Sequence, residues 1–238
     1  GRERDDGAAV VIEAAPDPAT ESWRNINAMN DLVDAILTMT DRLTIAALYG
    51  SAGAGGVMMA LAADRVFARD GIVLNPHYKG MGGLYGSEYW TYSLPKRVGP
   101  EKAMELTEQC LPISVYEARA MGLIDDVILH DDLGDSPFGR FREQITGIAE
   151  NLARSPRYGT WLAQKQATRN EDERLKPLQH YRSEELAEMK QNFWGKDRSY
   201  HLARAAFVRK QPRPGHMKGD AGLESVCGDE YCAGATHA

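Results

Sequence analysis

The residues best suited to chemistry lie in two glycine-rich loops. The first, Gly50-Ser51-Ala52-Gly53-Ala54-Gly55-Gly56, follows a β-rich run at 44–48 and precedes a run of helical composition at 57–64. Glycines let a ligand approach the backbone, and a helix start presents free N–H groups with a partial positive charge. This turn therefore suits an anion, or an oxygen atom that becomes anionic during a reaction.

The second loop carries side chains that can move protons. It spans residues 75–86 and contains His77, whose imidazole would titrate near neutral pH. A histidine that only fixes the geometry of its own loop is the alternative. The other candidates in or beside this loop are Tyr78, Tyr85, Glu88 and Tyr89. Tyr85, Tyr89 and Tyr92 fall on helical spacing and suit a protein core equally well.

Two nucleotide-binding motifs do not fit the first loop. No Gly-Lys-Ser/Thr ending follows it, and glycines at 50, 53, 55 and 56 do not give the G-x-G-x-x-G spacing. Taken alone, the pattern is also compatible with a plain structural turn between a strand and a helix.

Composition limits the class of protein. A chain of 238 residues with 43% hydrophobic residues can form one domain with a proper core. No apolar run reaches roughly 18 residues, which predicts no membrane span and, with a charged start, a cytoplasmic protein. A net charge of -6 argues against nucleic acid as the main partner.

The cysteines predict neither a disulfide framework nor a metal site. Three cysteines are too few for such a framework, which favours a reducing compartment. Cys227 and Cys232 lie near His216 and His237, but their C-x₄-C spacing does not match a compact zinc site. We therefore expect no metal.

The first half of the chain is expected to alternate helices and strands. Val10 to Ile12 reads as the end of a strand, and a helix at about 19–40, capped by Asp17 or Thr20, would place Asn30 on its polar face with Arg24, Asn27, Asp31 and Asp34. Further on, we expect a short helix from Ser87 to Pro95 and a helix from Pro100 to about Gln109. A capping box is predicted at Ser114–Glu117. A strand is expected at 123–129, with Asp125 and Asp126 at a solvated edge.

The remainder is predicted to be helical. The expected helices span 138–153, 157–169, 177–193 and 199–209, with Arg182, Glu184, Glu185 and Glu188 on exposed faces. The division is a core at 1–135, a helical region at 136–210 and a disordered tail at 211–238.

The whole stretch around the first loop resembles the crotonase superfamily, the enoyl-CoA hydratases and isomerases. Its members share a turn of the form G-x-A-x-G-G-G, here residues 50–56, then a helix ending in Asp, here Asp64, and a strand, here 66–68. The later matching residues are Arg97-Val98-Gly99, Ala103 to Leu106, Ile113-Ser114, Glu117-Ala118, Gly122-Leu123-Ile124 and Val127. The resemblance implies an α/β fold with a crotonase-like ββα spiral core, truncated at its N-terminus, and a helical C-terminal region.

A closer resemblance is to the C-terminal half of the HypX (HoxX) family, maturation proteins of nickel-iron hydrogenases. It runs from about Val11 to Lys210. The matching segments are Glu13 to Pro18, Ser22 to Met29, Leu74 to Lys79 and Leu84 to Tyr92. The family implies two partners, an N-terminal formyltransferase-like domain in the full-length protein and the hydrogenase maturation proteins.

The resemblance assigns roles to the loop residues. Gly55 matches a backbone donor that polarises a CoA-thioester carbonyl, and Ala54 and Gly56 keep the approach open. A backbone N–H of Ala8 to Val10 is one option for the second donor, but the favoured interpretation is a fragment or a divergent start that lacks part of the sheet. Enoyl-CoA hydration uses two glutamates, and their positions hold Met58 and His77 here, which disfavours hydratase activity.

The implied activity is decarbonylation of formyl-CoA to carbon monoxide and CoA. In this hypothesis His77 takes the formyl proton, and His77, Tyr78 or Glu88 helps to protonate the sulfur. Tyr85 and Tyr89 are expected to bind substrate. The alternatives are an enoyl-CoA hydratase or isomerase acting on another acyl-CoA, and a catalytically silent CoA-binding or docking module. Candidate contacts for the CoA phosphates are Lys79, Lys96, Arg97, Arg204, Arg209 and Lys210.

Overall fold

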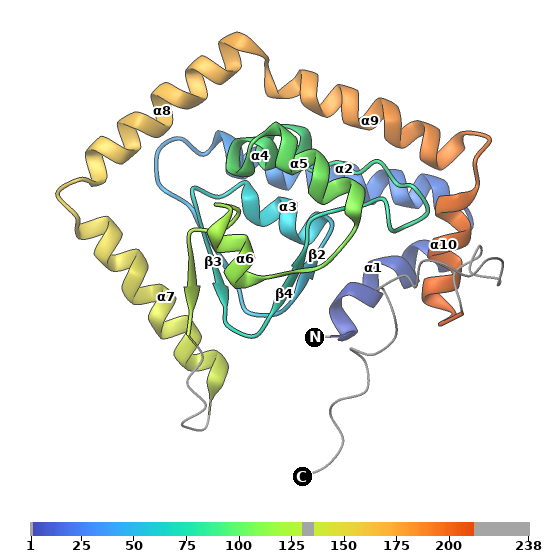
Figure 1. Ribbon diagram of the computed structural model, residues 1–238. Coiled ribbons are helices and arrows are strands. Elements are labelled where there is room, and N and C mark those ends of the chain that lie inside the picture. The colour runs from blue at the N-terminus through green and yellow to red at the C-terminus, as the bar shows by residue number, and fades with distance from the viewer. Residues whose placement is uncertain (1, 130–135, 212–238) are drawn as a thin grey trace.

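The protein is an α/β fold built around two small sheets. A computed structural model describes residues 2–129 and 136–211 (Figure 1). In one sheet β1 (Ile45–Leu48), β3 (Arg65–Arg69) and β6 (Asp126–Ile128) run parallel in the order β1-β3-β6. In the other, β4 (Val73–Asn75) pairs parallel with β2 (Ala52–Gly53) and antiparallel with β5 (Ile113–Ser114).

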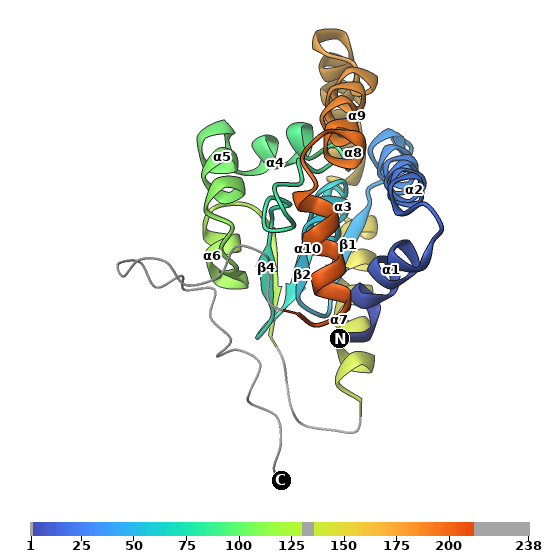
Figure 2. The same ribbon diagram turned by 90° about the vertical axis from the view of Figure 1, so that its right-hand side faces the viewer.

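Helices enclose these strands on two sides. The elements α4 (Trp90–Val98), α5 (Pro100–Gln109) and α6 (Val115–Ala120) lie on one side, and α1 (Arg2–Ala14) and α2 (Pro18–Thr38) lie on the other (Figure 2). Between them α3 (Gly55–Leu61) leaves the first glycine turn. The main apolar cluster includes Val57, Met58, Val66, Leu74 and Leu94. Met58 is fully buried in this cluster, so it serves the core.

The N-terminal helices differ in part from the prediction. The helix α2 is confirmed, and Asp17 caps it by accepting hydrogen bonds from the Ala19 and Thr20 amides. The predicted strand end at Val10 to Ile12 is wrong because these residues belong to α1. The helical conformation buries Ile12 and directs Glu13 to Arg204 of the last helix, at 3.0 Å.

Two local predictions in the middle of the chain also need correction. Ser87 does not open a helix, since its hydroxyl donates to Asn30 and α4 begins only at Trp90, with Pro95 inside it. Asp125 is not a solvated edge residue. Its carboxylate accepts from the Val66 amide at 2.7 Å and pairs with Arg97 at 2.8 Å, which joins β3 to the start of β6.

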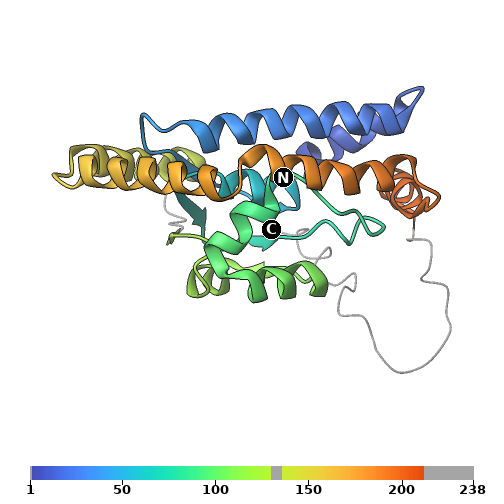
Figure 3. The ribbon, with the colours of Figure 1, turned by 90° about the horizontal axis from the view of Figure 1, so that it is seen from above.

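The predicted C-terminal helices are confirmed. They are α7 (Pro137–Arg154), α8 (Tyr158–Leu175), α9 (Leu178–Trp194) and α10 (Ser199–Val208), and they follow one another around the outside of the core (Figure 1). Seen from above, α9 runs beside α2, and the two helices are in contact (Figure 3). The prediction that Glu185 is exposed is wrong, because it is 0% exposed.

Two predictions can be compared only with the residues that the structure describes. The predicted tail, with Cys227, Cys232, His216 and His237, lies outside 2–129 and 136–211 apart from residue 211. Within those ranges, no helix combines the length and apolar character that a membrane crossing requires.

Candidate functional site

The carbonyl oxygen of Asn75 links the two glycine-rich loops beyond the pairing of β2 with β4. The oxygen of Asn75 accepts from the Ala54 amide and from the His77 amide, both at 2.9 Å. Ala54 adopts φ 47° and ψ -124°, a conformation that costs a non-glycine residue free energy. This backbone places Gly55 as the first residue of α3. Among the described residues no acceptor is recorded for the buried Gly55 amide.

A carboxyl group lies directly against Gly55. A Cβ atom added to Gly55 would be 3.2 Å from both Cδ and Oε1 of Glu88, and 3.0 Å from the terminal methyl of Met29. Only glycine fits this contact without displacing a neighbour. Gly55 and Glu88 are 33 positions apart in the sequence numbering, and the fold brings them together.

Glu88 is a buried acid with an altered proton affinity. Its side chain is 2% exposed, and the Tyr78 hydroxyl donates a hydrogen bond to Oε2. Burial raises the pKa of Glu88 to about 7, although the hydrogen bond from Tyr78 acts in the opposite direction. Burial and the adjacent Glu88 charge raise the pKa of Tyr78 well above its usual value, so Tyr78 stays a donor. At neutral pH Glu88 can therefore both accept and return a proton.

The Tyr78 ring needs a glycine beneath it. Gly86 has φ 92°, and a Cβ there would be 2.0 Å from Cδ2 of Tyr78. The ring thus lies across the loop backbone, with its hydroxyl also 3.0 Å from the Ser87 carbonyl oxygen. This packing brings Tyr78 to Glu88.

Asn30 is a site residue that the sequence reasoning missed. It was assigned to the polar face of its helix, but it is 0% exposed. Its Oδ1 accepts from Ser87 Oγ at 2.6 Å and from the Glu88 amide at 2.8 Å. The amide donor fixes the orientation of the Asn30 side chain, and Nδ2 is buried with no acceptor recorded in the described part of the chain. The available signal was its position four residues after the buried Ile26.

His77 contacts its own loop. It is half-buried, and its Nδ1 accepts from the Gly80 amide at 3.3 Å. A Cβ on Gly80 would be 2.7 Å from Cε1 of the ring. With Nδ1 as acceptor, the neutral ring carries its proton on Nε2. The structure brings Gly55, Tyr78 and Glu88 together. His77 contacts Gly80 of its own loop.

The two remaining tyrosine candidates take part in packing and in long-range hydrogen bonds. The Tyr85 ring packs on Trp90 with centroids 5.6 Å apart, and its amide donates to Asn192 at 2.9 Å. Tyr89 is 0% exposed and donates its hydroxyl hydrogen bond to Asp34 at 3.0 Å. Of the flanking residues of the turn, Gly56 has room for a Cβ, with Ala52 Cβ at 3.7 Å.

The cations proposed for the CoA phosphates already have partners. The ion pairs are Lys79 with Glu108, Lys96 with Asp172, Arg97 with Asp125, and Arg204 and Arg209 with Glu13. Lys210 lies over the Phe207 ring at 4.9 Å. A phosphate bound by the paired cations would have to compete with these carboxylates.

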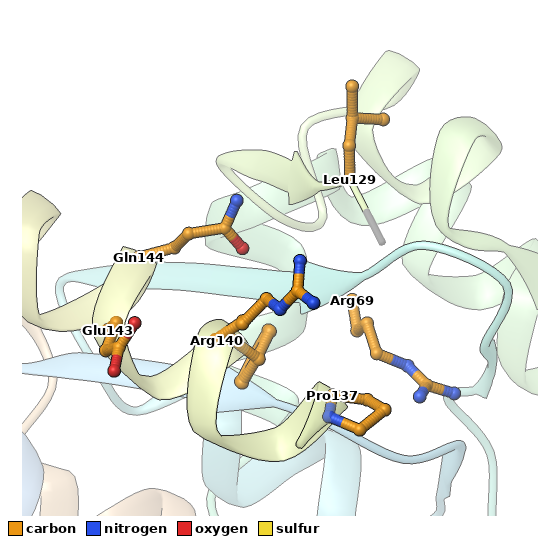
Figure 4. A pocket seen from close by; sticks show the side chains of 7 residues that line it. Arg69, Leu129, Pro137, Arg140, Glu143 and Gln144 are labelled. Atoms are coloured by element: carbon orange, nitrogen blue, oxygen red, sulfur yellow. The ribbon is translucent and has the colours of Figure 1, made fainter. Parts of the chain in front are cut away.

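A separate cavity lies beside the carboxyl ends of β3 and β6. It has a volume of about 180 Å³ and is lined by Arg69, Leu129, Arg140 and neighbouring residues of α7 (Figure 4). It contains none of the predicted site residues. In the parts of the chain that the structure describes, no group of three or more His, Cys, Asp and Glu side chains is arranged to hold a metal.

Comparison with known proteins shows the family and the fold. Residues 12–198 match the enoyl-CoA hydratase/isomerase family. The chain belongs to this family. An enoyl-CoA hydratase from Bacillus halodurans shares the fold, with a TM-score of 0.66 at 19% identity over 84% of this chain and 74% of that one.

Two relatives are more similar in sequence than that hydratase. The chain is 50% identical to the hydrogenase maturation factor HoxX of Bradyrhizobium diazoefficiens over 85% of its length. It is 48% identical to HypX of Aquifex aeolicus, solved in complex with tetrahydrofolic acid, with a TM-score of 0.78 over 86% of this chain. The chain spans about a third of each relative, 34% of HoxX and 35% of HypX. The resemblance to the crotonase superfamily and to HypX (HoxX) is thus confirmed.

Proposed function

We propose that this chain is a CoA-thioester lyase that releases carbon monoxide from formyl-CoA, as the crotonase-like part of a HypX-type hydrogenase maturation protein. The observation that carries the proposal is the buried Glu88 carboxyl group against the Gly55 backbone. The similarity of the chain to HoxX and HypX supports the role in hydrogenase maturation. An N-terminal formyltransferase-like domain and hydrogenase maturation proteins are the proposed partners.

The reaction requires one proton to move from carbon to sulfur. The Gly55 N–H donates to the formyl oxygen, and the Glu88 carboxylate removes the formyl proton. The C–H electron pair becomes the lone pair on the carbon of carbon monoxide, and the C–S pair leaves with sulfur. Protonated Glu88 then returns the proton to the thiolate, which gives CoA. No water, metal or oxidant takes part in this balance.

Glu88 fits the role of proton shuttle better than His77 does. The pKa of Glu88, raised to about 7 by burial, allows both halves of the transfer near neutral pH. Tyr78 steadies the carboxyl group by its hydrogen bond. His77 remains a second proposal for the shuttle, with its ring near the loop backbone of Gly80.

The crowding at Gly55 favours a small acyl group. Met29 and Glu88 both lie within 3.2 Å of the Cβ position of Gly55. A formyl group adds one hydrogen to the carbonyl carbon, whereas a crotonyl group adds three further carbons. This contact supports formyl-CoA over a longer enoyl-CoA, which is the first alternative.

The test is turnover of two substrates by the full chain. Formyl-CoA is expected to give carbon monoxide, followed as haemoglobin-bound gas, and crotonyl-CoA is expected to show no loss of enoyl absorbance. Glu88→Gln should lower the rate of release about 10²- to 10⁴-fold, the usual contribution of a general acid–base group, while His77→Ala should change it less.

Other results would contradict the proposal in distinct ways. Hydration of crotonyl-CoA without carbon monoxide release would favour the hydratase alternative. Binding of CoA without turnover of either thioester would favour a silent binding or docking module. A larger loss in His77→Ala than in Glu88→Gln would return the shuttle role to His77.

A further inference from the structure

Helix α9 holds the backbone next to Glu88 through one buried carboxylate. Oε2 of Glu185 accepts from the Tyr89 amide at 3.0 Å. Oε1 accepts from the Thr91 amide at 2.9 Å and from its hydroxyl at 2.6 Å. Glu185 is 0% exposed, so these bonds are shielded from water. A fully buried glutamate that makes three such bonds is a specific anchor for residues 89–91.

The anchored segment has a backbone conformation that needs support. Glu88 has φ 61° and Tyr89 has φ 57°, two successive residues other than glycine in the left-handed region. Such residues cost free energy and persist only where surrounding contacts fix them. Asn30 of α2 binds the Glu88 amide from one side, and Glu185 of α9 binds the Tyr89 amide from the other.

We propose that Glu185 is a positioning residue that holds the carboxyl group of Glu88 against Gly55. Without the anchor, residues 88 and 89 can relax toward ordinary backbone angles, and the Glu88 side chain would leave its contact with Gly55. Helix α9 then completes the active site from outside the ββα core. This inference rests on the proposed function only for its kinetic readouts.

The charge of Glu185 gives the anchor a second effect. Burial and, to a smaller extent, the nearby Glu88 raise the pKa of Glu185 to about 7, while the hydrogen bonds from Thr91 and Tyr89 act in the opposite direction. The interaction between the two carboxyl groups is mutual, so ionised Glu185 also disfavours ionisation of Glu88. The other titratable groups that respond to the Glu185 charge are Tyr78 and Tyr85, whose pKa values it raises.

The experiment compares Glu185→Gln with Glu188→Gln in the full chain. Both substitutions lie on α9 and remove one carboxylate, but Glu188 is exposed. In Glu185→Gln one of the three donors loses its acceptor, since the amide nitrogen cannot accept. We expect kcat for carbon monoxide release to fall about tenfold to 10²-fold, the scale of a small misplacement, with KM within about threefold. The pH midpoint should move down, because a negative neighbour is gone. Glu188→Gln should change none of these.

Two readouts do not depend on turnover. Amide hydrogen exchange at Tyr89 and Thr91 should be faster in Glu185→Gln, and infrared titration should give a lower pKa for Glu88. If wild-type protein releases no carbon monoxide, the proposed function fails, and these two readouts still decide the role of Glu185. Thr91→Val, which removes only the hydroxyl donor, should shift exchange in the same direction by a smaller amount.

A loss of thermal stability alone would overturn the proposal. In that case Glu185→Gln would lower Tm while kcat, the pH midpoint, exchange at 89–91 and the Glu88 titration stayed as in wild type. Glu185 would then be a buried structural residue without an effect on Glu88.

Discussion

The turn at 50–56 and the second loop, taken here with its continuation to Tyr89 before α4, form one candidate site by different means. The turn contributes backbone, the Gly55 amide and the absence of a side chain. The loop contributes side chains, Tyr78 and Glu88, and it is fixed from outside, by Asn30 58 positions before Glu88 and by Glu185 96 positions after Tyr89. Local sequence determines the turn, whereas the loop depends on two distant helices. Each prediction below changes a residue of one of these regions or of the α9 anchor.

The largest effect is expected in the dependence of stability on pH, and it involves the loop and its anchor on α9 rather than the turn. Burial raises the pKa of Glu88 and of Glu185 from 4.5 to about 7. A carboxyl group with a raised pKa in the folded state stabilises the fold below pH 4.5, and this contribution is lost as pH rises through 7. The free energy of unfolding should fall by roughly 3 kcal/mol per group across that window, at 1.36 kcal/mol per pKa unit.

Urea unfolding at pH 5 and pH 8 measures this loss. Glu88→Gln and Glu185→Gln should each remove about half of it, while Glu188→Gln should leave it intact. Carboxylates with lowered pKa values, such as Glu117 in its capping box, lose their contribution at lower pH and leave this window clear. An unchanged pH slope in both Glu88→Gln and Glu185→Gln would show that these groups do not titrate near 7.

The next effect tests the turn. Gly55→Ala puts a methyl group 3.0 Å from Met29 and 3.2 Å from Glu88, so one of these must move. We expect kcat for carbon monoxide release to fall about 10²-fold, since small misplacements of a catalytic group have effects of this size. Gly56→Ala is the matched control, because its Cβ would meet only Ala52, at 3.7 Å. Equal losses in the two variants would mean that the turn is sensitive as a whole, without a specific role for Gly55.

The smallest effect concerns the hydrogen bond inside the loop. Tyr78 lowers the pKa of Glu88 by donating to it, so Tyr78→Phe should raise that pKa. The rising limb of kcat/KM against pH should move to higher pH, and a shift of about one unit would cost about tenfold in rate below the midpoint. A midpoint that stays in place would separate Tyr78 from the acid–base group. Above the midpoint, wild type and Tyr78→Phe should converge.

The sequence was sufficient for the turn and for most helices. The glycine-rich turn could be recognised from its composition, and the resemblance to the crotonase superfamily singled out Gly55. The cap at Asp17 and the capping box at Ser114 follow local rules that the structure confirms. These features depend on neighbours within a few residues, which is why a pattern can predict them.

The sequence did not reveal what anchors the loop, because the anchors are polar residues that lie among buried residues on one face of a helix. Asn30 follows Ser22 and Ile26 at intervals of four, and Glu185 precedes Met189 and Phe193 at the same interval. All of these residues are buried, yet a polar side chain at such a position is assigned to the surface when its hydrogen-bond partner is unknown. The left-handed backbone at Glu88 and Tyr89 carries no glycine to mark it.

The order of synthesis gives the Glu185 anchor one more consequence. A ribosome makes Gly55, Tyr78 and Glu88 long before it makes Glu185, which follows Tyr89 by 96 positions. A nascent chain, or a product of a premature stop codon after α8, would carry all three residues and Asn30, but the loop would lack its second anchor, Glu185. Activity should therefore emerge late in translation, when α9 has left the exit tunnel and docked beside α2.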